Sequence, residues 1–140
     1  GFRYDSSIFP IHHDRYGIPD SPRYPWLIFN GNEGSQPPMW EFPISTVRIF
    51  GTNLPFVGGG YLRQFPMAFV RWGMRRVNRK ESQPVMIYIH PWEIDPDQPR
   101  QAVGTLTRLR HYRNLDKAEE RLLGLFEEFR FTTVREVLGL

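Results

Sequence analysis

Hydrophobic and polar positions follow different periods along the 140 residues, and each period predicts a different kind of element. In residues 39–50, apolar and polar side chains alternate, which predicts extended backbone with an edge or a bulge at Pro43. The uncharged run at 85–89 predicts a strand buried on both faces inside a parallel sheet. We expect this strand to end at His90, because Pro91 cannot continue a central ladder.

Helical spacing of apolar residues is clearest in residues 61–79, where Pro66 falls near the first turn, a position that tolerates proline. A second helix is predicted to end near residue 128, with Asn114 or Asp116 as its cap. Shorter patterns predict a short strand within 1–10, a turn at 52–60, an extended basic segment at 108–113, a strand at 129–134 and a last helical turn within 134–140.

Proline and glycine interrupt these elements. The 13 prolines and 12 glycines gather mainly in the first 66 residues and around 91–104, which predicts long, well-defined loops. Residues 30–35 are predicted to form a turn. The glycine triplet at 58–60 allows positive φ or the close approach of another group, but it lacks the spacing of a P-loop or of a dinucleotide fingerprint.

Composition narrows the class of protein. A chain of 140 residues makes a single domain or a partial domain, and an apolar fraction of 40% is enough for a core. Because there is no cysteine, a disulfide framework and a thiolate metal site are excluded. No apolar run approaches the roughly 18–20 residues of a membrane span, and no signal peptide is visible. The chain starts at Gly1 rather than at a methionine.

The net charge is only +3, but 16 of the 18 basic residues are arginines, which suit carboxylates, phosphates and stacking. Several of them lie near the end of the predicted helix at 61–79, together with Lys80. Such a basic helix end complements the helix dipole, and with interleaved aromatic residues it could also bind a nucleic-acid backbone with a steep salt dependence. A solvated basic face is the simpler interpretation, and we expect no nucleic-acid partner.

His90 is the first candidate for chemistry. It follows the predicted buried strand, and in α/β architectures functional side chains lie where strands end. Trp92, Glu93 and Asp95 follow within five residues. An isolated histidine that merely caps a strand is the alternative interpretation. The adjacent histidines at 12–13 would face opposite ways on a strand, so they do not predict a metal pair.

Five segments carry a family resemblance. They are 1–7 (GFRYDSS), 40–43 (WEFP), 58–61 (GGGY), 90–96 (HPWEIDP) and 110–112 (RHY). In this order, over nearly the whole chain, they resemble the C-terminal half of a polysaccharide deacetylase of the NodB-homology type. The similarity is to the bacterial deacetylases found with PEP-CTERM/XrtA exopolysaccharide systems in particular.

The resemblance implies an α/β fold that is the C-terminal part of a distorted (β/α) barrel, with long Pro/Gly-rich loops and an extended insertion. It implies a metal-dependent hydrolase that removes acetyl groups from N-acetylhexosamine units of an exopolysaccharide. His90 matches the late histidine that acts as the acid in that family, and Asp5 falls in a segment that shapes the active-site floor. Glu41, Tyr61 and Trp92 are the candidates for contact with the sugar. The implied location is the bacterial cytoplasm or membrane-associated exopolysaccharide machinery.

The family's metal-binding Asp and His-x-x-x-His pair lie upstream of anything in this chain. None of the four histidines here is spaced at i, i+4, and no carboxylate is placed to complete a three-ligand site. We therefore expect no metal in this chain alone, and zinc or another divalent metal in the complete protein. The carboxylate that orients His90 stays open among Asp5, Glu93 and Asp95.

The chain is thus interpreted as half of an enzyme, either a fragment or a part that the upstream half of the same barrel completes. Exposed strand edges and apolar surface would favour self-association of this half. The expected partner is an N-acetylated polysaccharide. The alternative function is a non-catalytic carbohydrate-binding or assembly module, which predicts saccharide affinity that does not depend on metal.

Overall fold

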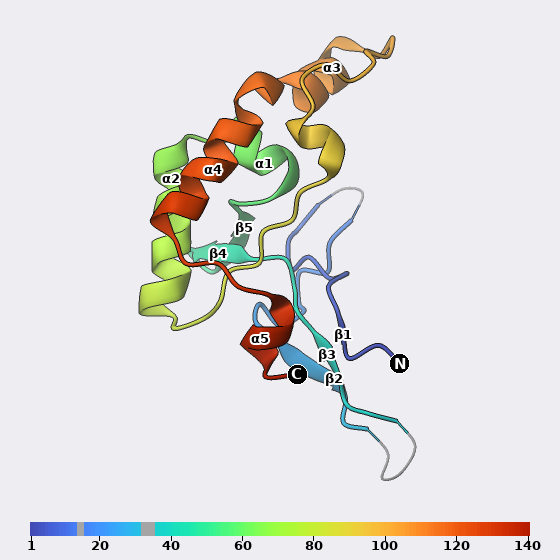
Figure 1. Cartoon of the computed structure of the whole chain (residues 1–140), viewed down its shortest axis with the longest axis vertical. Helices are drawn as coiled ribbons and strands as arrows, with labels where there is room; N and C mark the ends of the chain where they lie inside the picture. Colours follow the sequence, from blue (N-terminus) through green and yellow to red (C-terminus); the bar gives the residue numbers. More distant parts are fainter. Residues whose placement is uncertain (14–15, 32–35) are drawn as a thin grey trace.

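The computed structural model describes residues 1–13, 16–31 and 36–140. Figure 1 shows two regions along the long axis of the molecule: most helices lie in the upper part, and a small sheet lies below them near both termini. Part of the turn predicted at 30–35 falls on residues 32–35, outside the described residues.

The lower sheet has three strands. They are β1 (Tyr4–Asp5), β2 (Trp26–Phe29) and β3 (Met39–Glu41), in the order β1-β3-β2. β1 pairs in parallel with β3, and β2 pairs with it antiparallel. The short strand predicted within 1–10 is therefore confirmed as β1. The parallel register places Asp5 opposite Glu41, so two carboxylates lie on adjacent strands.

The predicted extended segment at 39–50 forms two strands, because residues 42–45 around Pro43 leave the ladder. After this interruption β4 (Thr46–Ile49) forms a hairpin with β5 (Thr52–Pro55). β5 corrects the prediction that residues 52–60 are only a turn. Phe50 and Gly51 connect the strands with φ of 47° and 82°. Two positive φ angles in a two-residue loop give a turn whose twist matches that of the flanking strands.

The predicted helix at 61–79 is divided by Pro66. α1 (Gly59–Gln64) ends where Phe65 adopts an extended conformation, and α2 (Met67–Arg75) begins after the proline. The proline ring disfavours helical backbone at the preceding residue, so the helix cannot run through. A π-helical turn, η1 (Arg76–Lys80), continues α2. The carbonyls left at the end of α1 are bonded by Arg121, whose NH1 contacts the oxygens of residues 62, 63 and 65 at 2.8–3.1 Å.

Residues 84–90 do not form the predicted buried strand. Val85, Ile87 and Ile89 pack against the core on one side, so the backbone has the alternation of a strand. Within the described residues, however, no neighbouring strand supplies a ladder for it. Only isolated hydrogen bonds form, such as the one from the Met86 N–H to Ser45 Oγ at 2.7 Å. Alternating apolar residues set an extended backbone, but strand pairing needs a partner edge.

The last third of the chain is helical. Its elements are η2 (Pro91–Ile94), α3 (Thr105–Tyr112), η3 (Leu115–Lys117), α4 (Ala118–Glu128) and α5 (Val134–Leu138). The predicted helix end at 128 and the final turn are confirmed. The predicted extended segment at 108–113 is wrong, because Leu and Arg are good helix formers and α3 contains no glycine or proline. The predicted strand at 129–134 is also wrong: residues 129–133 are irregular and lack a pairing partner in the described chain.

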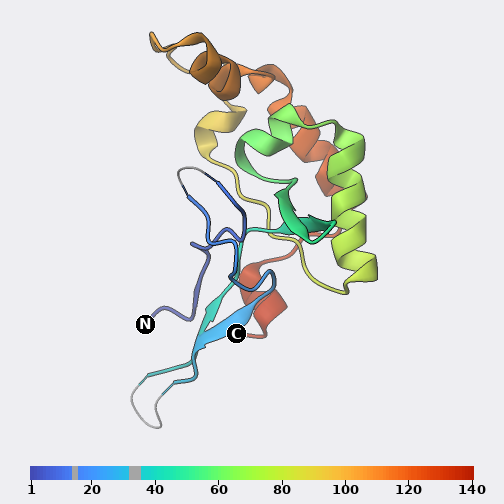
Figure 2. The same cartoon turned by 180° about the vertical axis from the view of Figure 1, so that it is seen from behind.

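The core lies between the β4–β5 hairpin and helices α1, α2 and α4. Figure 2 shows these elements grouped together from behind. Its buried members are Val47, Phe56, Val57, Leu62, Val70, Met74, Val77 and Leu125. The two small sheets are not joined, and the described residues do not close a barrel. The fold is therefore mixed α/β, and the (β/α) barrel stays a proposal for the complete protein.

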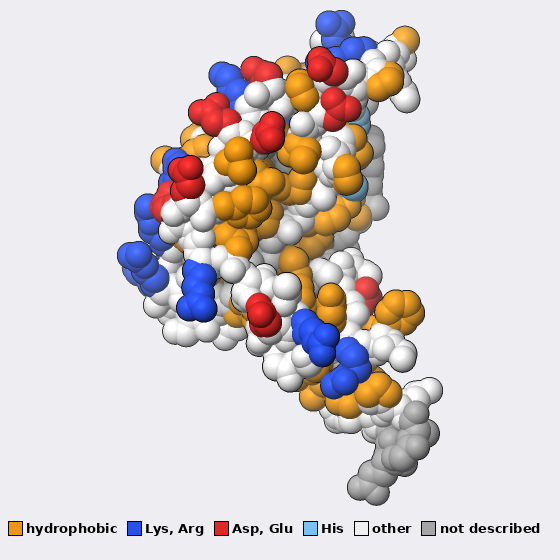
Figure 3. Space-filling model, in the orientation of Figure 1, with side chains coloured by type: hydrophobic (Ala, Val, Ile, Leu, Met, Phe, Trp, Pro, Cys, Tyr) orange, Lys and Arg blue, Asp and Glu red, His pale blue; other side chains and the backbone are white. Residues whose placement is uncertain are grey.

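An apolar groove of about 390 Å³ opens beside residues 84–89. Its walls come from that segment, from α4 and from the residues that follow α4. Phe126 and Phe131 meet edge to face there, with ring centroids 4.7 Å apart, yet they remain 49% and 38% exposed. Figure 3 shows hydrophobic side chains gathered in the middle of this face. The face thus presents apolar surface beside an unpaired extended segment.

Candidate functional site

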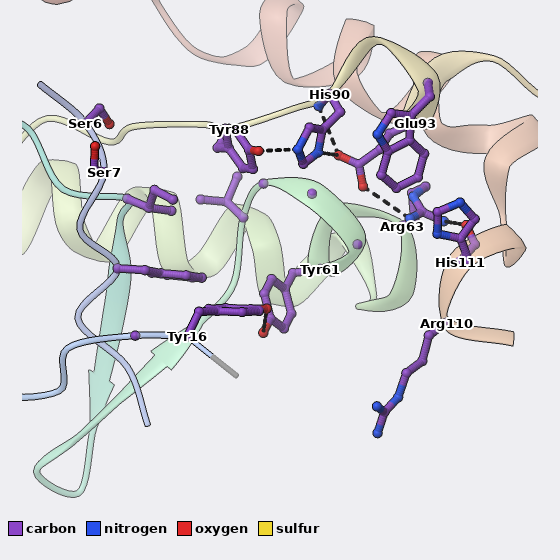
Figure 4. A pocket seen from close by; sticks show the side chains of 18 of the residues that line it. Ser6, Ser7, Tyr16, Tyr61, Arg63, Tyr88, His90, Glu93, Arg110 and His111 are labelled. Carbon is purple, nitrogen blue, oxygen red and sulfur yellow. Dashed lines mark hydrogen bonds and ion pairs between the residues drawn. The ribbon is translucent and has the colours of Figure 1, made fainter. Parts of the chain in front are cut away.

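A cavity of about 850 Å³ lies where the glycine triplet, the end of the extended segment and α3 meet. Figure 4 shows its walls from close by. Its lining includes Ser6, Ser7, Phe9, Tyr16, Gly58, Gly59, Gly60, Tyr61, Arg63, Tyr88, His90, Trp92, Glu93, Arg110 and His111. Most of the wall is aromatic or apolar, with a few polar groups among them, as is common in small-molecule sites.

The glycine triplet brings α1 against the segment that carries His90. Gly58 has φ of 91°, and a Cβ atom there would lie only 2.8 Å from the carbonyl oxygen of Tyr88. The Gly59 N–H donates a hydrogen bond to that same oxygen at 2.5 Å. A residue with a side chain at position 58 would be both strained and obstructed. The triplet therefore serves close backbone packing at the edge of the cavity.

His90 is the residue that precedes η2, and both of its ring nitrogens have partners. Nδ1 lies 3.4 Å from Oε2 of Glu93, and the backbone N–H of His90 donates to the same oxygen at 3.1 Å. Nε2 contacts the hydroxyl group of Tyr88. The extended backbone before His90 and the turn of η2 after it bring Glu93 under the ring. Of the three carboxylates open from the sequence, Glu93 is the one that contacts His90.

The other two carboxylates are engaged elsewhere. Asp95 Oδ1 accepts a hydrogen bond from the N–H of Asp97 at 3.0 Å. Asp5 accepts hydrogen bonds from the N–H of Ser6 and the hydroxyl of Ser7, at 2.8–2.9 Å. Asp5 is not part of the cavity lining, although both serines that it holds are. Its observed role is to shape the turn that forms one wall.

Glu41 lies on β3, fully buried and outside the cavity lining. Its Oε1 accepts a hydrogen bond from the N–H of Ile8 at 2.9 Å, and its Oε2 has no partner in the described chain. Burial raises the pKa of Glu41 above its usual 4.5; the hydrogen bond from Ile8 opposes the rise, and the negative charge of Asp5 adds to it. Glu41 thus fastens the 6–8 turn to the sheet from inside.

Arg63 is a site residue that the sequence did not single out. It is only 2% exposed, and its NH2 group lies 3.2 Å from Oε1 of Glu93. Its NH1 group donates to the carbonyl oxygens of His111 and Arg113 at 2.8 and 3.1 Å. Arg63 therefore neutralises Glu93 and ties the end of α3 to the wall. In the sequence it is one arginine of sixteen, without a local signal that could identify it.

Stacked rings connect the two histidines of the cavity. The ring of His90 stacks on Trp92 at 5.3 Å between centroids, and Trp92 stacks on His111 at 4.5 Å. The guanidinium of Arg63 lies 5.7 Å from the centre of the Trp92 ring. Trp92 is thus wedged between the two imidazoles and fixes both of them, while it also lines the cavity.

A second group of rings forms the opposite wall. Phe9 stacks on Tyr16 with centroids 6.3 Å apart and meets Tyr61 edge to face at 6.2 Å. The hydroxyl groups of Tyr16 and Tyr61 lie 3.3 Å apart. Flat aromatic faces with polar edges are suited to sugar rings. Of the five predicted site residues, the cavity brings together His90, Trp92 and Tyr61, whereas Asp5 and Glu41 stand behind its wall on the sheet.

No three His, Asp or Glu side chains of the described residues converge on a point where they could hold a metal ion. The residues that the structure describes therefore do not by themselves provide the ligands of a zinc site. The basic end of α2 is largely paired: Arg71 lies 2.6 Å from Glu128, Arg75 contacts the same carboxylate, and Arg76 lies 3.5 Å from Glu81.

Fold and cavity together define a mixed α/β domain with an aromatic, histidine-bearing site. The chain belongs to the family described as "Domain of unknown function (DUF3473)", which matches residues 6–139. This family is known as the C-terminal part of polysaccharide deacetylases. No curated protein and no solved structure matches the chain significantly. Among the described residues, no helix is long and apolar enough to cross a membrane.

Proposed function

We propose that this chain forms the saccharide-binding and proton-donating part of a metal-dependent deacetylase that removes acetyl groups from N-acetylhexosamine units of a bacterial exopolysaccharide. The observation that carries the proposal is the setting of His90: its ring lines an aromatic cavity, with Nδ1 facing a buried carboxylate. Membership in a family known as the C-terminal part of polysaccharide deacetylases supports it, as does the resemblance of the five sequence segments.

The proposed role of His90 is that of a general acid. When the C–N bond of the acetamide breaks, the electron pair stays on the nitrogen, and a proton must reach that nitrogen. A protonated His90 can give it from Nε2, while Glu93 accepts the hydrogen bond from Nδ1–H and stabilises the imidazolium charge. The Tyr88 hydroxyl holds Nε2 until the departing amine takes its place. Ionised Glu93 is in turn held by Arg63.

Activation of the attacking water is assigned to a different segment of the protein. General acid catalysis supplies about 10²–10⁴-fold, which is too little for amide hydrolysis by itself. The described residues hold no metal-ligating cluster. We therefore propose that the ligands and the base belong to the upstream half of the barrel, which would meet this chain along the cavity and the extended segment at 84–90.

The test uses the full-length protein that carries this domain together with the metal-binding segment. We expect His90→Ala to lower the turnover of an N-acetylglucosamine oligomer by roughly 10² or more, with bound zinc unchanged. Acetate release and metal analysis on the same preparation measure both quantities. His12→Ala, at an exposed position outside the cavity, is the matched control. Full activity of His90→Ala would remove His90 from the mechanism, and joint loss of zinc and activity would make it a ligand.

A non-catalytic carbohydrate-binding or assembly module is the second candidate function. The wall of Phe9, Tyr16 and Tyr61 favours it, because stacked aromatic rings bind sugars without any chemistry. In that case the full-length protein releases no acetate from any N-acetylated oligomer, yet it binds them with an affinity that chelators leave unchanged. Calorimetric titration with and without a chelator distinguishes the two functions.

A further inference from the structure

The charges of the described residues that line the cavity do not cancel. Glu93 is the single carboxylate among the described lining residues, and it is only 3% exposed. Its two oxygens are already bonded, one to Arg63 and the other to the N–H of His90. Its negative charge is thus neutralised inside the wall and does not reach the cavity. The basic side chains that line the cavity are those of two arginines, Arg63 and Arg110, and two histidines, His90 and His111.

Of the two arginines, only Arg110 is available to a ligand. The guanidinium of Arg63 is buried and bonded to Glu93 and to two carbonyl oxygens. Arg110 is exposed on α3, and no dashed line joins its side chain to the other residues drawn in Figure 4. Among the described residues its guanidinium has no carboxylate or hydrogen-bond partner. Only its carbonyl oxygen is engaged, by Nε2 of Gln64 at 3.2 Å.

The helix that carries Arg110 offers no counter-charge of its own. α3 has the sequence TLTRLRHY, which contains no acidic residue. A bond from α1 to the Arg110 carbonyl and the two bonds from Arg63 hold the end of this helix against the cavity. The backbone of Arg110 is therefore held at the cavity wall, while its guanidinium is not neutralised by any of the described residues. Complementing the helix dipole explains basic residues at the end of α3 in general, but not the placement of one of them in the cavity.

The position of Arg110 relative to His90 follows from the stacked rings. His111, the next residue, is separated from His90 only by the Trp92 ring. His111, and with it the α3 backbone next to Arg110, thus lies on the far side of Trp92 from His90. A saccharide whose acetamide faces His90 would have to extend past Trp92 to reach Arg110. The tyrosines at 16 and 61 lie on the wall beside this path.

We infer that the natural ligand of this cavity is an anionic saccharide, in which Arg110 binds an oxyanion on the sugar unit next to the acetylated one. A planar guanidinium binds a carboxylate, a sulfate or a phosphate through paired N–H groups. A cleft with apolar walls also strengthens the attraction for an opposite charge. The inference deepens the proposed function and rests on it for the role of His90, while the binding of the anion can be measured without turnover.

The experiment compares three oligosaccharides on the full-length protein: one alternating N-acetylglucosamine with glucuronate, the same oligomer with its carboxyl groups reduced to alcohols, and the reduced oligomer carrying sulfate. Affinity is measured by calorimetry and kcat/KM by acetate release. We expect the glucuronate or the sulfate oligomer to bind about tenfold or more tightly than the reduced one at low salt, with the difference shrinking as salt rises. Which anionic oligomer binds better identifies the oxyanion.

Arg110→Gln tests the residue. This substitution should lower the affinity for the anionic oligomer by about tenfold or more. It should leave the affinity for the reduced oligomer unchanged. Arg108→Gln is the matched control, since Arg108 is exposed on the same helix but does not line the cavity. Thermal unfolding of both variants checks that the fold is retained, and Arg110→Lys should keep part of the preference, because it keeps the charge but loses the paired donors.

Equal affinity of the wild-type protein for charged and reduced oligomers would overturn the inference, and so would an Arg110→Gln variant that binds both as the wild type does. Either result leaves the proposed function intact if His90→Ala still abolishes acetate release. The converse result, preference for the anionic oligomer without acetate release from any substrate, supports the anion site and contradicts the deacetylase function.

Discussion

At the scale of single residues, Glu93 and Arg63 form a buried ion pair in the wall behind His90, with side chains 3% and 2% exposed. Removing one partner of such a pair leaves a buried charge without compensation, whereas replacing both with apolar residues is often neutral. The pair also decides how His90 is oriented, because the same carboxylate meets its Nδ1. Stability and site geometry therefore depend on the same two side chains.

We predict that Arg63→Met lowers the free energy of unfolding by about 3–5 kcal/mol, and that the double variant Arg63→Met, Glu93→Met loses less than the sum of the single changes. Urea unfolding of the wild type, the two single variants and the double variant measures the coupling energy between Arg63 and Glu93. Additive losses would contradict a mutually compensating pair.

Glu41 is a second buried carboxylate, with a different consequence. Burial raises its pKa in the folded state, so the folded protein holds this proton more tightly than the unfolded chain does. Its contribution to stability is therefore present at low pH and is lost as pH rises from the usual 4.5 through the raised pKa. Above the raised pKa, the ionised carboxylate of Glu41 weakens the fold.

We predict that Glu41→Gln removes this part of the pH dependence. The difference in unfolding free energy between variant and wild type should shift in favour of the variant as pH rises from the usual 4.5 through the raised pKa of Glu41. Denaturant unfolding across that range measures it. Asp5→Asn is the comparison, because it removes only the charge that adds to the rise and should flatten the curve less. A difference that stays constant with pH would exclude titration of Glu41 in this range.

At the scale of elements, two glycines of the triplet differ in whether a side chain could be accommodated at their position. Gly58 has positive φ and faces the Tyr88 backbone. At Gly60, in α1, a Cβ would lie 3.2 Å from Nε2 of Gln64, a flexible side-chain end, and 3.7 Å from NH2 of Arg63, which is ordinary van der Waals contact. An alanine at 58 must move backbone atoms, while one at 60 displaces a side chain that can rotate. The triplet is needed for close packing at one position and not at the other.

We predict that Gly58→Ala destabilises the protein by about 1–3 kcal/mol or more, and that Gly60→Ala is neutral or slightly stabilising, since alanine favours helix. Thermal unfolding of both variants gives the comparison. Because residue 58 supports the backbone of Tyr88, its replacement should also disturb the His90 side of the cavity. Equal effects at the two positions would contradict this account.

At the scale of the whole molecule, an unpaired extended segment lies beside an apolar groove. Residues 84–90 have no ladder partner in the described chain, and Phe126 and Phe131 are half-exposed next to them. An open edge with apolar surface favours association with another chain. In the proposed complete protein, the upstream half of the barrel covers this face.

We predict that the 140-residue chain made alone self-associates as its concentration rises. A double variant, Phe126→Asp with Phe131→Asp, should shift it toward monomer, because it removes apolar surface from the groove. The matched control is Leu106→Asp, which removes a side chain that is 62% exposed on α3 and lies away from the groove. Sedimentation velocity at several concentrations measures the effect. A monodisperse, cooperatively unfolding wild-type chain would contradict the prediction.

Local sequence by itself determined the elements whose cause lies within a few residues. The strand within 1–10, the interruption at Pro43, the helix ending at residue 128 and the final helical turn all follow from nearby side chains and backbone preferences. His90 and Trp92 also stand out in the sequence, because they follow an apolar extended run, and both line the cavity.

Tertiary structure decided what depends on distant partners. Residues 84–90 are extended by their own sequence, but whether they pair as a strand depends on a neighbour that the described chain lacks. Arg63 acquires its role from Glu93, 30 residues away, and from the carbonyl of His111, 48 residues away. Three carboxylates were equivalent candidates in the sequence, and only the turn of η2 brought Glu93 to His90. Tertiary packing determines these partners, because a buried charge is stable only where the fold supplies its counter-charge.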